Sequence, residues 1–159
     1  MHKDSQGFER AFALGDLAAT EALGARIAAS MRVGDAVALE GDLGAGKTTL
    51  ARAILRALGV TENVPSPTFT LVQSYETPLM PVRHFDLYRV TDSSELDELG
   101  LDEALDEGAA LIEWPERAGS RLPQDALHVA LSLDADGRHA LIAGSERWAK
   151  AFGEIHHAH

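Results

Sequence analysis

The spacing of apolar residues in the first third of the chain predicts helix, strand and helix in that order. Apolar residues recur at every fourth position from 23 to 31, in a segment that Asp16 can cap, so we expect a helix over residues 16–31. The small apolar residues at 36–39 are typical of a strand buried on both faces, as in a parallel sheet. A second apolar stripe over residues 50–58 predicts an amphipathic helix.

The middle of the chain is richer in residues that favour strands. Runs of β-branched and aromatic residues at 69–75 and 82–89 predict a hairpin. The acidic segment 92–107 predicts two short helices broken at Gly100, and the apolar run 109–112 predicts another buried strand. The hydrophobic pattern thus indicates an α/β protein.

The last third predicts a strand pair over residues 126–133 and 138–143, closed by a short helix over 146–152. No repeat or linker divides the chain, and 159 residues suit one domain. We therefore expect a single domain with frayed ends at about 1–8 and 153–159.

Composition excludes several classes of protein. The chain has no cysteine, which excludes disulfide scaffolds, thiolate zinc sites and a cysteine nucleophile. No apolar run is long enough to span a membrane, and the start opens into no secretory segment, so we expect a cytoplasmic protein with no membrane partner. A net charge of −11 opposes direct binding of nucleic acid. Eight acids without a base lie within residues 92–107, either as a solvated helical face or as a docking surface for a basic partner.

Residues 41–48 carry the strongest chemical signal. They read GDLGAGKT and satisfy G-x-x-x-x-G-K-[ST], the P-loop, between the expected buried strand and amphipathic helix. Glycines tolerate the positive φ angles that turn several N–H groups toward one phosphate. Lys47 can reach the β- and γ-phosphates, and Thr48 can present its hydroxyl to Mg²⁺. The residues expected to contact the nucleotide here are Gly41, Asp42, Leu43, Gly44, Ala45, Gly46, Lys47, Thr48 and Thr49.

Two carboxylates are candidates for the metal and the attacking water. Glu113 ends the apolar run, so it is expected at the carboxyl edge of the sheet, where α/β folds bind ligands. Asp86 is either a surface acid on a strand or a second site residue. His84 can transfer protons, although a structural, hydrogen-bonded histidine is the favoured interpretation, and Trp114 covers the site or fills the core.

A proline-restricted segment follows the P-loop helix. Ser66 and Thr68 lie in this segment, where a threonine can sense Mg²⁺ or the γ-phosphate as a switch residue does. The alternative is a rigid turn with a capping hydroxyl.

Five motifs occur together: GDLGAGKTT at 41–49, SPTFT at 66–70, HFDLYR at 84–89, ELDELG at 95–100 and IEWP at 112–115. With them the chain resembles the TsaE (YjeE) family, small bacterial P-loop ATPases of tRNA threonylcarbamoyladenosine (t6A) biosynthesis. The resemblance implies a P-loop NTPase-like, three-layer α/β fold with a central, mostly parallel sheet plus antiparallel strands. It also implies weak ATP hydrolysis, with ATP and Mg²⁺ as cofactors, coupled to TsaD-like and TsaB-like partners that modify adenosine 37 of tRNA. Contact with tRNA is expected only through that complex, and the isolated chain is expected to be monomeric.

The resemblance also implies roles for individual residues. Lys47 and Thr48 bind phosphates and Mg²⁺, Lys47 also acting in catalysis, while Asp86 and Glu113 attend the metal and the attacking water in a division that stays open. Thr68, with Ser66, is the switch, and Trp114 lies beside the nucleotide. Residues expected to border the base are Thr20, Gly137 and Arg138.

The nucleotide and the reaction class each have alternatives. Neither Lys3 nor Lys150 is followed by Asp two positions on, so the guanine-reading motif of GTPases is absent and ATP is favoured. A small-molecule kinase needs an arginine-bearing lid, and no insertion of that length is evident. A nucleotide-gated binding module with negligible turnover is the nearer alternative.

Overall fold

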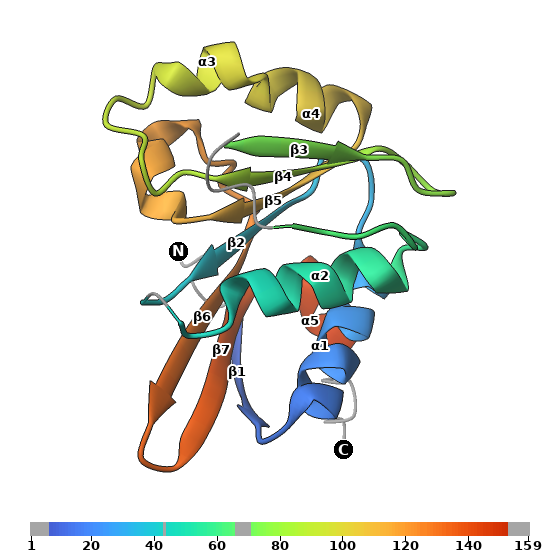
Figure 1. Ribbon diagram of the computed structural model, residues 1–159, viewed down its shortest axis with the longest axis vertical. Coiled ribbons are helices and arrows are strands. Elements are labelled where there is room, and N and C mark those ends of the chain that lie inside the picture. Colours follow the sequence, from blue (N-terminus) through green and yellow to red (C-terminus); the bar gives the residue numbers. More distant parts are fainter. Residues whose placement is uncertain (1–6, 43, 66–70, 153–159) are drawn as a thin grey trace.

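A mixed sheet of seven strands forms the centre of the computed structural model, which describes residues 7–42, 44–65 and 71–152 (Figure 1). The strands are β1 (Gly7–Leu14), β2 (Ala36–Glu40), β3 (Val72–Tyr75), β4 (Val82–Asp86), β5 (Ala109–Glu113), β6 (Leu127–Asp134) and β7 (Gly137–Ser145). Their order across the sheet is β1-β7-β6-β2-β5-β4-β3. The four central strands β6, β2, β5 and β4 are parallel, and β7, β1 and β3 add antiparallel pairs at the two edges. The expected mostly parallel sheet is confirmed.

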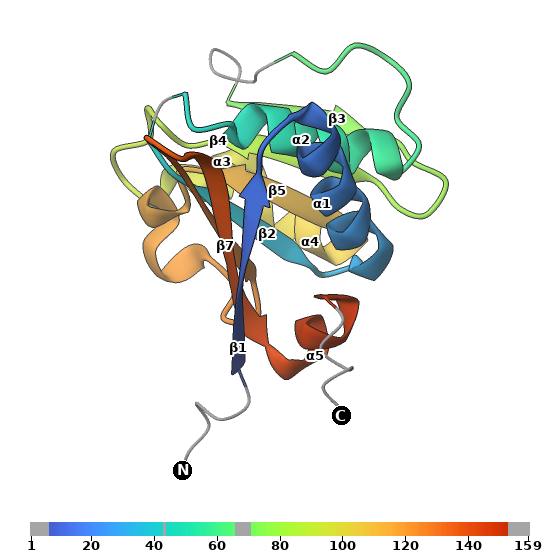
Figure 2. The ribbon, with the colours of Figure 1, turned by 90° about the horizontal axis from the view of Figure 1, so that it is seen from below.

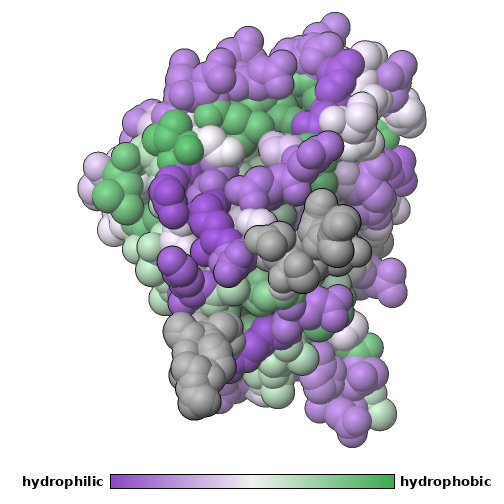
Figure 3. All heavy atoms as spheres, turned by 180° about the vertical axis from the view of Figure 1, so that it is seen from behind, coloured by the Kyte–Doolittle hydropathy of each residue, from purple (hydrophilic) through white to green (hydrophobic). Residues whose placement is uncertain are grey.

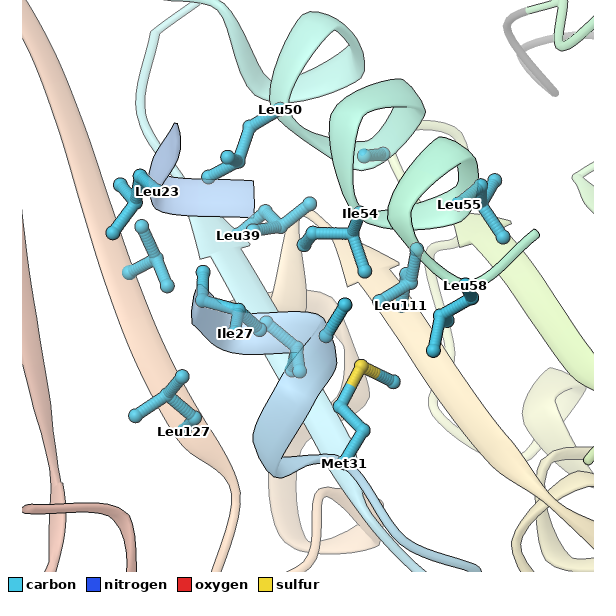
Figure 4. Packing of buried hydrophobic residues seen from close by; sticks show 14 of the residues in the cluster. Leu23, Ile27, Met31, Leu39, Leu50, Ile54, Leu55, Leu58, Leu111 and Leu127 are labelled. Atoms are coloured by element: carbon cyan, nitrogen blue, oxygen red, sulfur yellow. The ribbon is translucent and has the colours of Figure 1, made fainter. Parts of the chain in front are cut away.

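Helices α1 (Leu17–Ser30) and α2 (Lys47–Ala57) cover one face of the sheet. Asp16 caps α1 as expected, its carboxylate accepting from the Ala19 amide at 2.9 Å. Leucine and isoleucine side chains from both helices meet those of β2, β5 and β6 in one buried cluster (Figure 4). This cluster fixes α2, and therefore the loop before it, against the ends of the central strands.

The opposite face carries α3 (Glu95–Leu99), α4 (Leu101–Glu107) and the 3₁₀ segment η2 (Pro115–Arg121). Leu96 and Leu101 turn inward into a second buried cluster with Phe85 and Ile112. Two helical layers around one sheet give the expected three-layer arrangement. Polar side chains cover much of the top of the molecule, where α3 and α4 lie (Figure 3). The break at Gly100 is confirmed, since this residue takes the left-handed conformation between the two helices.

The elements predicted from periodicity are confirmed with shifted ends, apart from residues 69 and 70 of the first hairpin strand, which lie outside the described residues. The strand expected over 82–89 ends at Asp86, and the closing helix is α5 (Glu146–Ala149) followed by the 3₁₀ turn η3 (Lys150–Phe152). In the described ranges, no helix has the length and apolar character needed to cross a membrane.

Strand β1 is the element that the sequence analysis missed. Gly7 and Phe8 were expected in a frayed end, and that prediction is wrong, because β1 begins at Gly7 and pairs with β7 along its whole length (Figure 2). The Phe8 ring stacks on Phe152 with their centroids 5.8 Å apart. Burial alternates along the strand with a period of two, but the amino-acid types do not show it, because Arg10 occupies an inward position and alanines occupy outward positions.

Candidate functional site

The carboxyl ends of three parallel strands bring the candidate site together. Strand β2 runs into the glycine loop at residues 41–46, and its neighbour β5 ends at Glu113, which pairs with Leu39 of β2 and Asp86 of β4. Residues paired across parallel strands face the same side of the sheet, here the side of α2. The two predicted carboxylates, Asp86 and Glu113, therefore lie side by side and buried, at 5% and 3% exposure.

The glycine loop has the backbone that its sequence predicts. Gly41, Gly44 and Gly46 have φ values of 143°, 84° and 109°, all in the left-handed region. Gly41 also passes so close to β6 that a Cβ atom there would lie 2.5 Å from the Leu131 carbonyl oxygen. Gly46 begins α2 without a side-chain cap, so the amides of the first helical turn and the positive end of the helix dipole face the loop. This is the arrangement that binds phosphate groups.

Lys47 extends back along the loop. Its Nζ donates to the Gly41 carbonyl oxygen and to the Asp42 carbonyl oxygen, the latter at 3.1 Å, and lies 4.2 Å from the centre of the Trp114 ring. Burial lowers the pKa of Lys47 below its ordinary value of 10.5, against the opposing attraction of Glu113 and Asp86. The ammonium is thus held among oxygens and an aromatic face, at the mouth of the loop.

Thr48, Glu113 and His84 form a hydrogen-bonded chain beneath the loop. The Thr48 hydroxyl donates to Glu113, at 3.0 Å from Oε2 and 3.2 Å from Oε1. On its other side, Glu113 Oε2 lies 2.7 Å from Nε2 of His84, which is fully buried. Asp86 accepts from the Tyr88 amide at 3.0 Å. The site thus places a hydroxyl and two carboxylates at the first turn of α2.

A cavity of about 350 Å³ opens in front of these groups. The loop and α2 line it with Gly44, Gly46, Lys47, Thr48 and Thr49. The strand ends line it with Asp86, Tyr88, Arg89, Glu113 and Trp114, and Arg138 closes one side. Tyr88 and Arg89 had not been expected at the site, although their place at the end of the HFDLYR motif, two and three residues after Asp86, is a usable signal for them.

The residues expected near the base are only partly brought together. Thr20, Thr49 and Arg138 line a smaller cavity of about 120 Å³ beside Gly46, and Arg138 belongs to both cavities. Gly137 is the first residue of β7, directly after the turn that joins β6 to β7, and it is not among the residues that line either cavity. Leu43, Ser66 and Thr68 fall outside the described residues.

Trp114 adopts an unusual backbone conformation for a large residue. Its φ of 61° and ψ of 51° place it in the left-handed region, immediately after β5. The ring lies 4.9 Å from that of Tyr88, measured between centroids, and covers Lys47. Trp114 therefore belongs to the wall of the site.

The oxygen donors suit Mg²⁺. Across the part of the chain that the structure describes, no group of three or more His, Cys, Asp or Glu side chains could hold a metal ion. Mg²⁺ needs no such cage, because it takes one or two carboxylates and completes its shell with water and phosphate oxygens. Thr48 with Asp86 and Glu113 fits that requirement.

A buried parallel strand, a glycine loop ending in Lys-Thr, a helix, and a carboxylate at the end of the neighbouring strand define a P-loop α/β protein. The profile described as "Threonylcarbamoyl adenosine biosynthesis protein TsaE" matches residues 14–140, and the chain belongs to the TsaE family.

Individual relatives agree with this assignment. The chain is 42% identical over 118 residues to the Bacillus subtilis tRNA threonylcarbamoyladenosine biosynthesis protein TsaE, covering 74% of this chain and 73% of the relative. It is 39% identical over 138 residues to the Streptomyces coelicolor protein of the same name, covering 81% and 93%. The crystal structure of Bacillus subtilis YdiB superposes with a TM-score of 0.75 at 30% identity, covering 96% of this chain and 95% of that chain.

Proposed function

We propose that this chain is the ATP-binding and ATP-hydrolysing subunit of the machinery that forms t6A in tRNA. The proposal rests on family membership, which supplies the process, and on one observation at the site, which supplies the chemistry. That observation is the hydrogen bond from the Thr48 hydroxyl, at the start of α2, to the Glu113 carboxylate at the end of β5.

The residues of the site divide the work of phosphoryl transfer to water. The loop amides and Lys47 would hold the β- and γ-phosphates, and Thr48 and Asp86 would hold Mg²⁺, which would supply positive charge to the phosphate oxygens. Glu113 orients the attacking water and accepts its proton. Its burial beside Lys47 keeps bulk water away from the carboxylate.

ATP rather than GTP is the nucleotide that we propose. The cavity beside Gly46, with Thr20 and Arg138 in its wall, has room to extend the site from the phosphates toward a ribose or base. Trp114 lies on the side of Lys47, where it shields the phosphates rather than the base.

TsaD-like and TsaB-like proteins are the proposed partners. A chain with a net charge of −11 is a poor binder of tRNA, so we assign contact with tRNA to those partners. Hydrolysis is expected to be slow in the isolated chain and faster in the complex.

The test is phosphate release from ATP by the full chain, alone and with the two partner proteins and tRNA, together with t6A formation. Stimulated release that depends on Lys47 and accompanies t6A formation supports the proposal. ATP binding without stimulated release would instead define a nucleotide-gated binding module, and a phosphorylated small-molecule product would define a kinase.

A further inference from the structure

His84 is the one fully buried charged or polar side chain in contact with Glu113 among the described residues. It lies on β4 two residues before Asp86, so both side chains face the α2 side of the sheet. His84 does not line the cavity in front of the loop. Within the described part of the chain, its side chain therefore reaches the site through the Glu113 carboxylate.

The hydrogen bonds of the imidazole fix how it meets Glu113. Nε2 lies 2.7 Å from Glu113 Oε2, whereas Nδ1 is buried and has no hydrogen-bond partner among the residues that the structure describes. A buried N–H without a partner costs more than an unused ring lone pair, so the proton belongs on Nε2 and Nδ1 is left as the bare acceptor. His84 thus donates one hydrogen bond to one carboxylate oxygen.

This contact makes the two oxygens of Glu113 unequal. Oε2 accepts from His84 and lies nearer the Thr48 hydroxyl, at 3.0 Å, while among the described residues Oε1 has only the longer Thr48 contact, at 3.2 Å. Oε1 therefore keeps the greater capacity to accept another hydrogen bond.

We propose that His84 is a positioning residue for Glu113. It holds Oε2 toward the sheet and leaves Oε1 to orient the attacking water. The inference rests on the proposed hydrolytic role of Glu113. It assigns His84 no contact with nucleotide or metal.

Turnover in the partner complex tests the inference. His84→Phe keeps an aromatic ring without the donor, and it is expected to lower kcat about 10–100-fold, as loss of an orienting partner typically does, with KM for ATP nearly unchanged. His84→Gln restores a donor near Nε2 and is expected to recover most of the rate. The matched control is His139→Phe, because His139 is also a strand histidine paired with a carboxylate, Asp134, at 3.3 Å.

Double substitution separates positioning from damage to the fold. If His84 acts through Glu113, His84→Phe in a Glu113→Gln background lowers kcat no further. If the two substitutions together lower kcat by the product of their separate effects, or if His84→Phe alone keeps the wild-type rate, the inference is overturned while the ATPase proposal stays intact.

Imidazole NMR supplies a readout without turnover. The Nε2 proton of His84 is expected as a slowly exchanging resonance that Glu113→Ala shifts or abolishes and that His139→Phe leaves unchanged. A proton found on Nδ1, or a resonance indifferent to Glu113→Ala, would refute the inference even if the chain hydrolyses no ATP.

Discussion

Replacing Lys47 with Met removes the ammonium group but keeps an unbranched stem at the start of α2. Lys47 Nζ now bonds two loop carbonyl oxygens and lies over the Trp114 ring, so we expect it to exchange these contacts for phosphate oxygens when ATP binds. A hydrogen bond to a charged group contributes about 1.5–3 kcal/mol, and about 1.4 kcal/mol corresponds to a tenfold change in affinity. Lys47→Met is therefore expected to weaken ATP binding by about 10–150-fold.

The same substitution is expected to cost little folding stability. Burial lowers the pKa of Lys47, so the charged ammonium is less stable in the folded protein than in water. Removing the charge relieves that penalty and offsets the loss of the carbonyl and ring contacts. We expect the melting temperature of Lys47→Met to stay within about 2–4 °C of the wild type, which corresponds to about 1 kcal/mol.

Two further variants make the experiment specific. Lys47→Arg should not restore affinity, because a planar guanidinium spreads its charge over a fork and does not reproduce the compact ammonium that contacts two loop carbonyls and the Trp114 ring. Lys150→Met is the matched control, since Lys150 is exposed in η3, and it should bind ATP like the wild type. Affinities come from calorimetric titration with ATP and Mg²⁺. Wild-type affinity in Lys47→Met would refute the assignment of this ammonium to the phosphates.

Three other expectations concern the same site. Glu113→Ala should retain ATP binding and lower turnover in the complex by about 10²–10⁴-fold, and unchanged phosphate release would remove Glu113 from the mechanism. Gly41→Ala should lower the free energy of unfolding, measured in urea titrations, by more than about 1 kcal/mol. The added Cβ would lie 2.5 Å from the Leu131 carbonyl oxygen, and the φ of +143° is strained for alanine. Stability equal to that of the wild type would contradict the loop geometry. Between the lowered pKa of Lys47 and 10.5, the unfolded chain binds more protons than the folded chain, so the contribution of Lys47 to folding stability rises with pH, while ATP affinity falls as the ammonium loses its proton. Lys47→Met should flatten both trends. Identical pH profiles of stability and affinity in Lys47→Met and the wild type would argue against the lowered pKa.

Local signals in the sequence predicted the framework of the site well. The loop glycines, Lys47 and Thr48 lie within one short segment, whose conformation depends on residues next to each other. Glu113 was placed correctly because it ends an apolar run, and a parallel strand must end at the ligand-binding edge. The α/β class followed from the same alternation of buried strands and helices, whereas the three-layer arrangement was implied by the family resemblance.

Contacts between distant segments were beyond the same reasoning. The Lys47 contact with Trp114 depends on a left-handed backbone at a tryptophan, which no propensity favours. The placement of Arg138 at the cavity depends on the β6–β7 hairpin reaching the loop, and only the family resemblance pointed there. Strand β1 was missed because its alternation is weak in composition, although its pairing with β7 is complete.

The pairing of β4 with β5 explains why His84 could be singled out but not assigned. Its partners across the sheet are Leu111 on β5 and Gln73 on β3, and Asp86 is the residue opposite Glu113, so a pairing rule alone would join the two acids and leave the histidine without an acidic neighbour. A slip of one residue would turn His84 to the other face and break its contact with Glu113. The chemistry of this histidine is thus a property of strand register, which depends on the whole sheet.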